Sequence, residues 1–150
     1  MRIAMVVTPF DDHNLQLARQ IGVTDIVIRY AGPEVSDMQP LCEQVQAHGM
    51  DVTVVEGYLP IDRVVLGLEG WQVQIDELSR LIVSMGACGI GVLCYNWMGL
   101  TDWTRTSVDT PGRGGALCTE FDREQVEALG PLEGPHVGAE ALWENLRRFL

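Results

Sequence analysis

The stretch that decides the fold runs from Ile90 to Thr106 and reads IGVLCYNWMGLTDWTRT. Its apolar first part, Ile90 to Tyr95, follows a glycine-rich turn, as expected of a buried strand. The part after Tyr95 is polar and aromatic and predicts a loop that lasts until about Phe121. Loops of this length in a compact domain are usually functional or disordered. The two tryptophans argue against disorder, which is poor in aromatic residues, so the stretch predicts a strand followed by a functional loop.

Three earlier apolar, β-branched runs predict further strands at residues 3–7, 25–30 and 51–56. Segments with helical periodicity separate these runs, so that strand and helix alternate four times. This alternation predicts right-handed βαβ units on a parallel sheet, with the strands in sequence order and the helices over the outer face.

Five helices are predicted. The first covers residues 14–20, and the second is one that Ser36 can cap. The third covers residues 71–85 and ends at Gly86, and the last two cover residues 122–129 and 139–150. In the third helix the apolar stripe consists of Trp71, Ile75, Leu78, Ile82 and Met85. In the last helix the predicted inward residues are Leu142, Leu146 and Phe149.

The fold class is therefore α/β, of the TIM-barrel type, with about four βα units. A closed (β/α)8 barrel needs roughly 200–250 residues, so residues 1–150 predict a single partial-barrel domain.

The last helix ends on Arg147-Arg148-Phe149-Leu150 without a glycine or asparagine stop, which favours truncation within that helix. Two alternatives remain: a truncated barrel, or a half-barrel that completes itself by dimerising. Unpaired edges at the first and fourth strands predict an aggregation-prone or dimeric chain.

Composition limits the partners of this chain. A net charge of −11 argues against nucleic acid and anionic membranes as partners, because both attract basic patches. No run approaches the roughly 20 apolar residues of a membrane span, and residues 3–7 are too few for a signal peptide. The four cysteines form no C-x-x-C pair, which favours reduced thiols. We expect a cytoplasmic protein.

Ligands of parallel α/β folds bind at the carboxyl ends of the strands. The positions to inspect are therefore residues 8–13, 29–30, 56–58 and 95 onward. Arg105 is the leading candidate, because a guanidinium grips a carboxylate with two parallel hydrogen bonds. The alternative is that Arg105 pairs with Asp102 or Asp109 and only holds the loop.

The other candidates also have structural alternatives. Trp97 and Trp103 are suited to wall a sugar or to pin the loop. Glu56 is suited to acid–base work if its pKa is raised, or to a structural hydrogen bond, and Asn96 to a ligand contact or a backbone turn. Residues 11–13, Asp-Asp-His, contain metal-ligand types, but adjacent loop residues rarely converge on one ion, so we interpret them as a cap for the next helix.

The segment from Val92 to Arg105, with Gly114 to Leu117 and Phe121-Asp122 after it, resembles the Cys-Tyr-Asn-Phe-Met…Asp-Trp-Thr-Arg-Thr segment of the mannonate dehydratase family. Val54-Val55-Glu56 at a strand end and Leu142 to Leu146 in the last helix agree in order. The resemblance thus covers nearly the whole chain and corresponds to the N-terminal, half-barrel portion of that family, and it implies a barrel of the xylose-isomerase-like type.

The resemblance implies a metal-dependent hydro-lyase that converts D-mannonate, a small sugar acid, into 2-keto-3-deoxy-D-gluconate and water in hexuronate catabolism. It implies Mn²⁺ or Fe²⁺, whose ligands come from later strands, so it places no metal ligand in this chain. It also implies substrate-binding positions at Asn96, Asp102, Trp103, Arg105 and Glu56, and leaves the catalytic acid and base unidentified. We expect the 150 residues alone to be inactive.

Two alternatives belong to other classes of protein. One is a related metal-dependent sugar isomerase or epimerase barrel, which would share the fold but not the Asp-Trp-Thr-Arg loop. The other is a non-catalytic fragment, or half-barrel, that self-associates through its exposed sheet edges.

Overall fold

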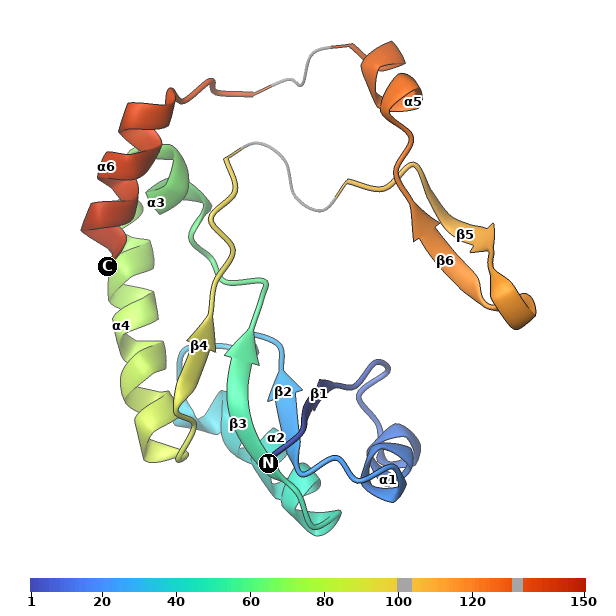
Figure 1. Ribbon diagram of the computed structural model, residues 1–150. Helices are drawn as coiled ribbons and strands as arrows, with labels where there is room; N and C mark the ends of the chain where they lie inside the picture. The colour runs from blue at the N-terminus through green and yellow to red at the C-terminus, as the bar shows by residue number, and fades with distance from the viewer. Residues whose placement is uncertain (100–103, 131–133) are drawn as a thin grey trace.

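The computed structural model describes residues 1–99, 104–130 and 134–150. Four strands form one parallel sheet in the order β1-β2-β3-β4 (Figure 1), which confirms the predicted order and direction. The third strand has the predicted bounds, and the other three are shorter than predicted. The strands are β1 (Ala4–Val6), β2 (Asp25–Ile28), β3 (Asp51–Glu56) and β4 (Val92–Cys94).

The described helices are α1 (Asp12–Gln20), α2 (Val35–Ala47), α3 (Asp62–Leu66), α4 (Trp71–Ala87), α5 (Arg123–Ala128) and α6 (Ala139–Phe149). All of the predicted helices are present. The sequence did not reveal α3, because five residues are too few to show helical periodicity. The Asp11 carboxylate accepts a hydrogen bond from the Asn14 N–H at 2.8 Å and caps α1, so the interpretation of residues 11–13 as a helix start is confirmed.

Two helix-boundary predictions are wrong. Ser36 lies inside α2, where the Asp37 carboxylate instead accepts a hydrogen bond from the Glu34 N–H at 2.9 Å. Gly86 also lies inside its helix, because α4 continues to Ala87 and the left-handed residue beyond it is Gly89, with φ +74°. Asp37, rather than Ser36, provides the capping hydrogen bond. Gly89, rather than Gly86, provides the positive φ beyond the end of α4.

Helices and strands enclose one main hydrophobic core, on one face of the sheet. From the strands it takes Ile26, Ile28, Val52 and Val55, and from α4 it takes Leu78, Leu81 and Met85. The predicted stripe of α4 is wrong at Ile82, which is 53% exposed, whereas Leu81 is 1% exposed. One helical residue turns the side chain by about 100°, so a small rotation of the helix exchanges these two positions.

Residues 107–120, expected as loop, form an antiparallel hairpin of β5 (Ser107–Pro111) and β6 (Leu117–Glu120). The short helix η1 (Arg113–Gly115) makes the turn, and Gly114 has φ +70° there. The hairpin and α5 lie apart from the four-stranded sheet (Figure 1). No residue of β6 is buried. Its sequence, Leu-Cys-Thr-Glu, therefore needs no alternation of apolar and polar residues, which is the pattern by which a strand is recognised.

Within residues 1–99, 104–130 and 134–150, no helix combines the length and apolar character that crossing a membrane requires.

Candidate functional site

The carboxyl ends of β2 and β3 bring together a cation and a carboxylate. Arg29 follows β2, and its Nη1 lies 3.5 Å from Oε2 of Glu56, the last residue of β3. The same Nη1 donates a hydrogen bond to the Glu56 backbone carbonyl oxygen at 3.3 Å. Both side chains are about two-fifths exposed, so the guanidinium also faces solvent above the sheet. This pair is the best-defined polar cluster at the predicted ligand-binding edge.

The turn after β3 is shaped around Arg29. Gly57 has φ +76°, and a Cβ there would lie 3.1 Å from the Arg29 Nη1. Tyr58 also has a positive φ, +56°, which is uncommon for a residue other than glycine. Its ring lies beneath the Arg29 guanidinium at 5.4 Å from ring centroid to Cζ, a cation–π distance. Together, glycine, tyrosine and glutamate hold the guanidinium at the strand ends.

Arg29 was not among the residues we predicted to contact substrate, although its strand end was among the positions to inspect. The sequence offered one indication of the side on which Arg29 lies. Alternate residues of a strand share one face, so Arg29 lies on the same face as Val27 and Asp25. The distinction from Tyr30, which points to the other face, required the structure. The Tyr30 hydroxyl donates a hydrogen bond to Glu77 Oε1 of α4, and burial, followed by this carboxylate, raises the pKa of Tyr30 above its usual range.

Asn96 is exposed in the segment that follows β4. Its two aromatic neighbours pack on α6. The ring centroids of Tyr95 and Phe149 are 4.8 Å apart, and those of Trp97 and Phe149 are 5.2 Å apart. Trp97 also packs against the cluster around Ile61, Val64 and Val65. Its position therefore corresponds to the alternative in which a tryptophan pins the loop.

Arg105 lies at the base of the hairpin. Its Nε donates to the Thr119 Oγ1 at 3.3 Å, and its Nη1 donates to the Thr104 backbone oxygen at 3.0 Å. Because the hairpin lies apart from the sheet (Figure 1), the structure does not bring Arg105 to Glu56. Asp102 and Trp103, the other two predicted loop residues, lie outside the described residues.

The described residues contain no group of three or more His, Cys, Asp or Glu side chains placed to hold a metal ion. Of the histidines, His48 ends α2 and its Nε2 lies 3.1 Å from the Asp12 Oδ1, which is a contact between two helices rather than a metal site. Hydrogen bonds from Gln44 and His48 lower the pKa of Asp12.

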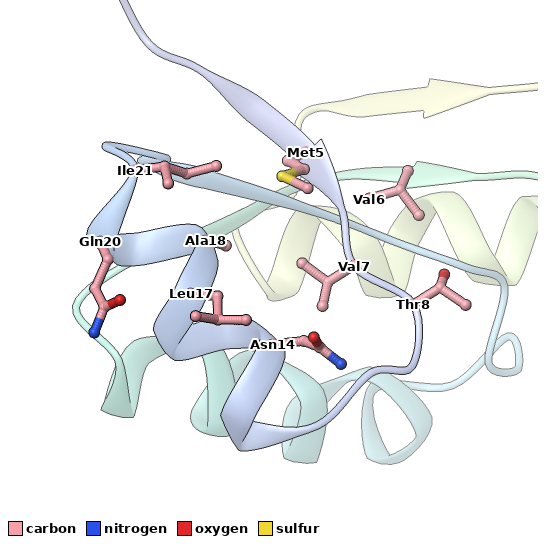
Figure 2. Close-up of a pocket in the computed structure, with 9 residues that line it drawn as sticks. All are labelled: Met5, Val6, Val7, Thr8, Asn14, Leu17, Ala18, Gln20 and Ile21. Atoms are coloured by element: carbon pink, nitrogen blue, oxygen red, sulfur yellow. The ribbon is translucent and has the colours of Figure 1, made fainter. Parts of the chain in front are cut away.

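One apolar cavity lies away from this polar cluster. It is an open groove of about 490 Å³ between β1 and α1 (Figure 2). The described lining is mainly apolar, with Met5, Leu17 and Ile21 prominent, and it contains no charged side chain. An anionic sugar acid requires a cation in its site, so the cavity does not match that ligand.

Comparison with known proteins gives one consistent result. The family model described as "D-mannonate dehydratase (UxuA)" matches residues 2–150. A protein named mannonate dehydratase from Chromohalobacter salexigens is 32% identical over 148 residues, which cover 93% of this chain. Another of that name from Bacillus subtilis is 31% identical over 130 residues, or 82% of this chain.

The fold has a solved counterpart. The crystal structure of mannonate dehydratase from Streptococcus suis serotype 2 superimposes with a TM-score of 0.83 over 99% of this chain, at 24% identity. The chain covers only 46% of that structure, and it spans 37% and 36% of the Chromohalobacter and Bacillus proteins. The chain thus corresponds to less than half the length of the proteins that it resembles.

Proposed function

The chain belongs to the D-mannonate dehydratase family, and we propose that it supplies the N-terminal half of a barrel hydro-lyase that acts on D-mannonate. The proposed reaction removes water from this sugar acid and gives 2-keto-3-deoxy-D-gluconate. The observation that carries the proposal is the match of the family model to residues 2–150. It is supported by a parallel sheet whose four strands follow the sequence order of half a (β/α)8 barrel.

In this proposal the chain's own residues bind the substrate. The sugar acid carries a carboxylate, and the chain has a net charge of −11, so the site requires local cations. Arg29 supplies one at the strand ends, next to Glu56, where Glu56 and Asn96 can bond to the substrate hydroxyl groups. Arg105, with Asp102 and Trp103, is proposed as a second contact in the complete barrel, although Arg105 here lies at the base of the hairpin, apart from the sheet (Figure 1). A guanidinium suits this role because it binds a carboxylate with two parallel hydrogen bonds.

The family resemblance implies manganese or ferrous iron, and the described residues do not fit such an ion. They include no group of three or more suitable side chains, and the carboxylate at the strand ends, Glu56, is already paired with Arg29. We therefore propose that the metal ligands come from the other half of the barrel. The contribution of this chain is to bind and orient the sugar acid.

Chemical-shift titration tests the substrate-binding proposal. The ¹⁵N-labelled chain is titrated with D-mannonate and, as a control without the carboxylate, with D-mannitol. We expect saturable shifts at Arg29, Gly57 and Asn96 with D-mannonate only, and loss of these shifts in Arg29→Gln. Equal shifts with both ligands, or no shift at the strand ends, would contradict the proposed binding site.

An activity assay tests the division between the two halves. We expect residues 1–150 with Mn²⁺ to form no 2-keto-3-deoxy-D-gluconate from D-mannonate, because too few metal ligands are present in the described residues. Turnover by this chain alone, abolished by a chelator and restored by Mn²⁺, would show that the proposed division is wrong.

A further inference from the structure

Two of the four thiols lie together in one recess near the amino-terminal ends of the strands. The recess has a volume of about 260 Å³, and Cys42 and Cys88 both line it. Its lining also includes Arg2, just before β1, and Asp51, the first residue of β3. The recess is therefore at the opposite end of the strands from the polar cluster proposed to bind the sugar acid.

The packing of two helices brings these thiols together. On α2, Cys42 follows Met38 by one turn and precedes Val45 by one turn, and both neighbours are buried in the main core. Cys42 therefore lies on the inward face of that helix. Cys88 is the C-cap of α4, one turn after the buried Met85. The two helices contact each other, and both cysteines pack at the edge of the core.

The two thiols also interact. Burial first, and then the neighbouring Cys88 through its charge and a hydrogen bond, raise the pKa of Cys42. The contact has two explanations. Half-buried cysteines can simply fill a helix contact as small hydrophobic side chains, or the pair can exchange its two protons for a sulfur–sulfur bond.

The recess is accessible to a small oxidant. Both cysteines are only partly buried. The side chains of Arg2 and Asp51 at its rim are 64% and 65% exposed, so the recess opens to solvent. Because Cys88 ends its helix, where the last turn readily frays, its Cβ can adjust to the distance of about 3.5–4.5 Å that a disulfide requires. The buried residues earlier in α4 need not move.

This recess does not involve the outer edges of the sheet. The helix that carries Cys42 connects β2 to β3, and the helix that ends at Cys88 leads into β4. Both thiols thus come from connections between strands of this chain. An inference from this pair is independent of the proposed reaction and of the other half of the barrel.

We propose that Cys42 and Cys88 form a redox-active pair that a low-molecular-weight disulfide converts into an intramolecular disulfide. The Cys88 thiolate attacks one sulfur of the oxidant, whose S–S bond breaks, and the departing thiolate takes up the proton that Cys88 lost. Cys42 then loses its proton and attacks the Cys88 sulfur of the mixed disulfide, which releases a second small thiol. Two protein thiols are oxidised, and one small disulfide is reduced to two thiols.

The order of the two steps follows from burial. The thiolate is the attacking form, and burial disfavours the thiolate of Cys42, so Cys88 reacts first and Cys42 closes the bond. The product ties α2 to α4 around β3. A cross-link across so long a loop restricts the unfolded chain, so oxidation should stabilise the fold.

Equilibration with 2-hydroxyethyl disulfide and 2-mercaptoethanol tests the proposal. This couple is neutral, which avoids repulsion by a chain of net charge −11. The chain carries Cys94→Ser and Cys118→Ser, and mass spectrometry after acid quenching distinguishes loss of two hydrogens from addition of mercaptoethanol. We expect an intramolecular disulfide whose effective concentration is at least about tenfold higher in the folded chain than in urea, the equivalent of roughly 1.4 kcal/mol. The urea midpoint should rise on oxidation.

Two variants serve as controls. Adding Cys42→Ser to the same chain should stop the reaction at a mixed disulfide on Cys88. The matched control keeps the exposed Cys94 and Cys118 and replaces the proposed pair by serine. It should form only mixed disulfides, because β6 lies in the hairpin, apart from β4 (Figure 1).

Four results would overturn the proposal. The first is mixed disulfides on both Cys42 and Cys88 without closure, and the second is an equal effective concentration in the folded and unfolded chains. The third is a disulfide that lowers the urea midpoint, which would mean that the bond forms only by distorting the fold. The fourth is equally ready closure between Cys94 and Cys118 in the matched control.

Discussion

The Asn145 Nδ2 of α6 donates a hydrogen bond to the Val65 backbone oxygen of α3 at 3.0 Å, and both residues are buried. Asparagine thereby satisfies one of the carbonyls that the end of a helix leaves without an intrahelical partner. Gly67 ends the same helix with φ +66°, and a Cβ there would lie 2.9 Å from the Asn145 Nδ2. The contact therefore joins the last helix, α6, to α3, the short helix that follows β3.

Asn145→Ala should lower the free energy of unfolding by about 1–3 kcal/mol, because it leaves a buried carbonyl without a donor. Gly67→Ala should also destabilise, through the positive φ and the close approach to Asn145. Urea denaturation measures both effects. The control is Glu144→Ala, which removes only the exposed ion pair with Arg148 and should cost less than about 0.5 kcal/mol. Equal losses for Asn145→Ala and Glu144→Ala would contradict the structural role of Asn145.

Asp25 makes the stability of the chain sensitive to acid. It is 2% exposed, and its Oδ2 accepts hydrogen bonds from the Thr24 hydroxyl at 2.6 Å and the Arg2 Nε at 2.9 Å. Burial alone would raise the pKa of Asp25, but the bonds from Thr24, Arg2 and Thr53, with the charge of Arg2, outweigh burial and lower it.

A lowered pKa in the folded state stabilises the fold above the unfolded pKa of about 3.9, and this stability is lost as the pH falls through the folded value. We therefore expect the free energy of unfolding to decline below about pH 4. In Asp25→Asn the decline should be shallower, and stability at pH 7 should fall by about 1–3 kcal/mol. Identical pH profiles for the two proteins would refute this account.

The four thiols should react at different rates with iodoacetamide at pH 8. Burial first, and then the neighbouring Cys88, raise the pKa of Cys42, and the thiolate is the reactive form. Cys94 and Cys118 are exposed. Peptide mapping by mass spectrometry should find these two alkylated first and Cys42 last. Cys88→Ser should accelerate Cys42, whereas Cys118→Ser should not. If Cys42 is alkylated as fast as Cys118, its burial is not the controlling factor.

Arg105 should matter for turnover in a form that has both barrel halves. Such a form is residues 1–150 joined to the remaining portion of the Chromohalobacter relative. Arg105→Ala should lower kcat/KM by about 10–100-fold, the effect of losing charge-assisted hydrogen bonds of about 1.5–3 kcal/mol. Arg29→Ala should act in the same direction. Arg113→Ala removes the same charge from the hairpin turn and serves as the control, so an equal loss there would point to net charge rather than to a contact.

The sequence by itself determined the repeating strands and helices and the family. The run from Asp51 to Glu56 has the observed bounds of β3, because its four central residues, Val52 to Val55, are all β-branched and favour a strand wherever they occur. The segment from Val92 to Arg105 carried the family resemblance that the comparisons confirm. These features are local, since they depend on which residues follow one another.

Only the tertiary structure decided the features that depend on partners. The hairpin of β5 and β6 is held by pairing between exposed strands, so no burial pattern marks it in the sequence. The Arg29–Glu56 pair joins residues 27 positions apart, and its geometry depends on the register of β2 and β3. The alignment of one valine from each strand requires the registers of all four strands at once, and these residues are Val6, Val27, Val54 and Val92. Register is a relation between chain segments, and an amino-acid pattern along one segment specifies only which of its faces is apolar.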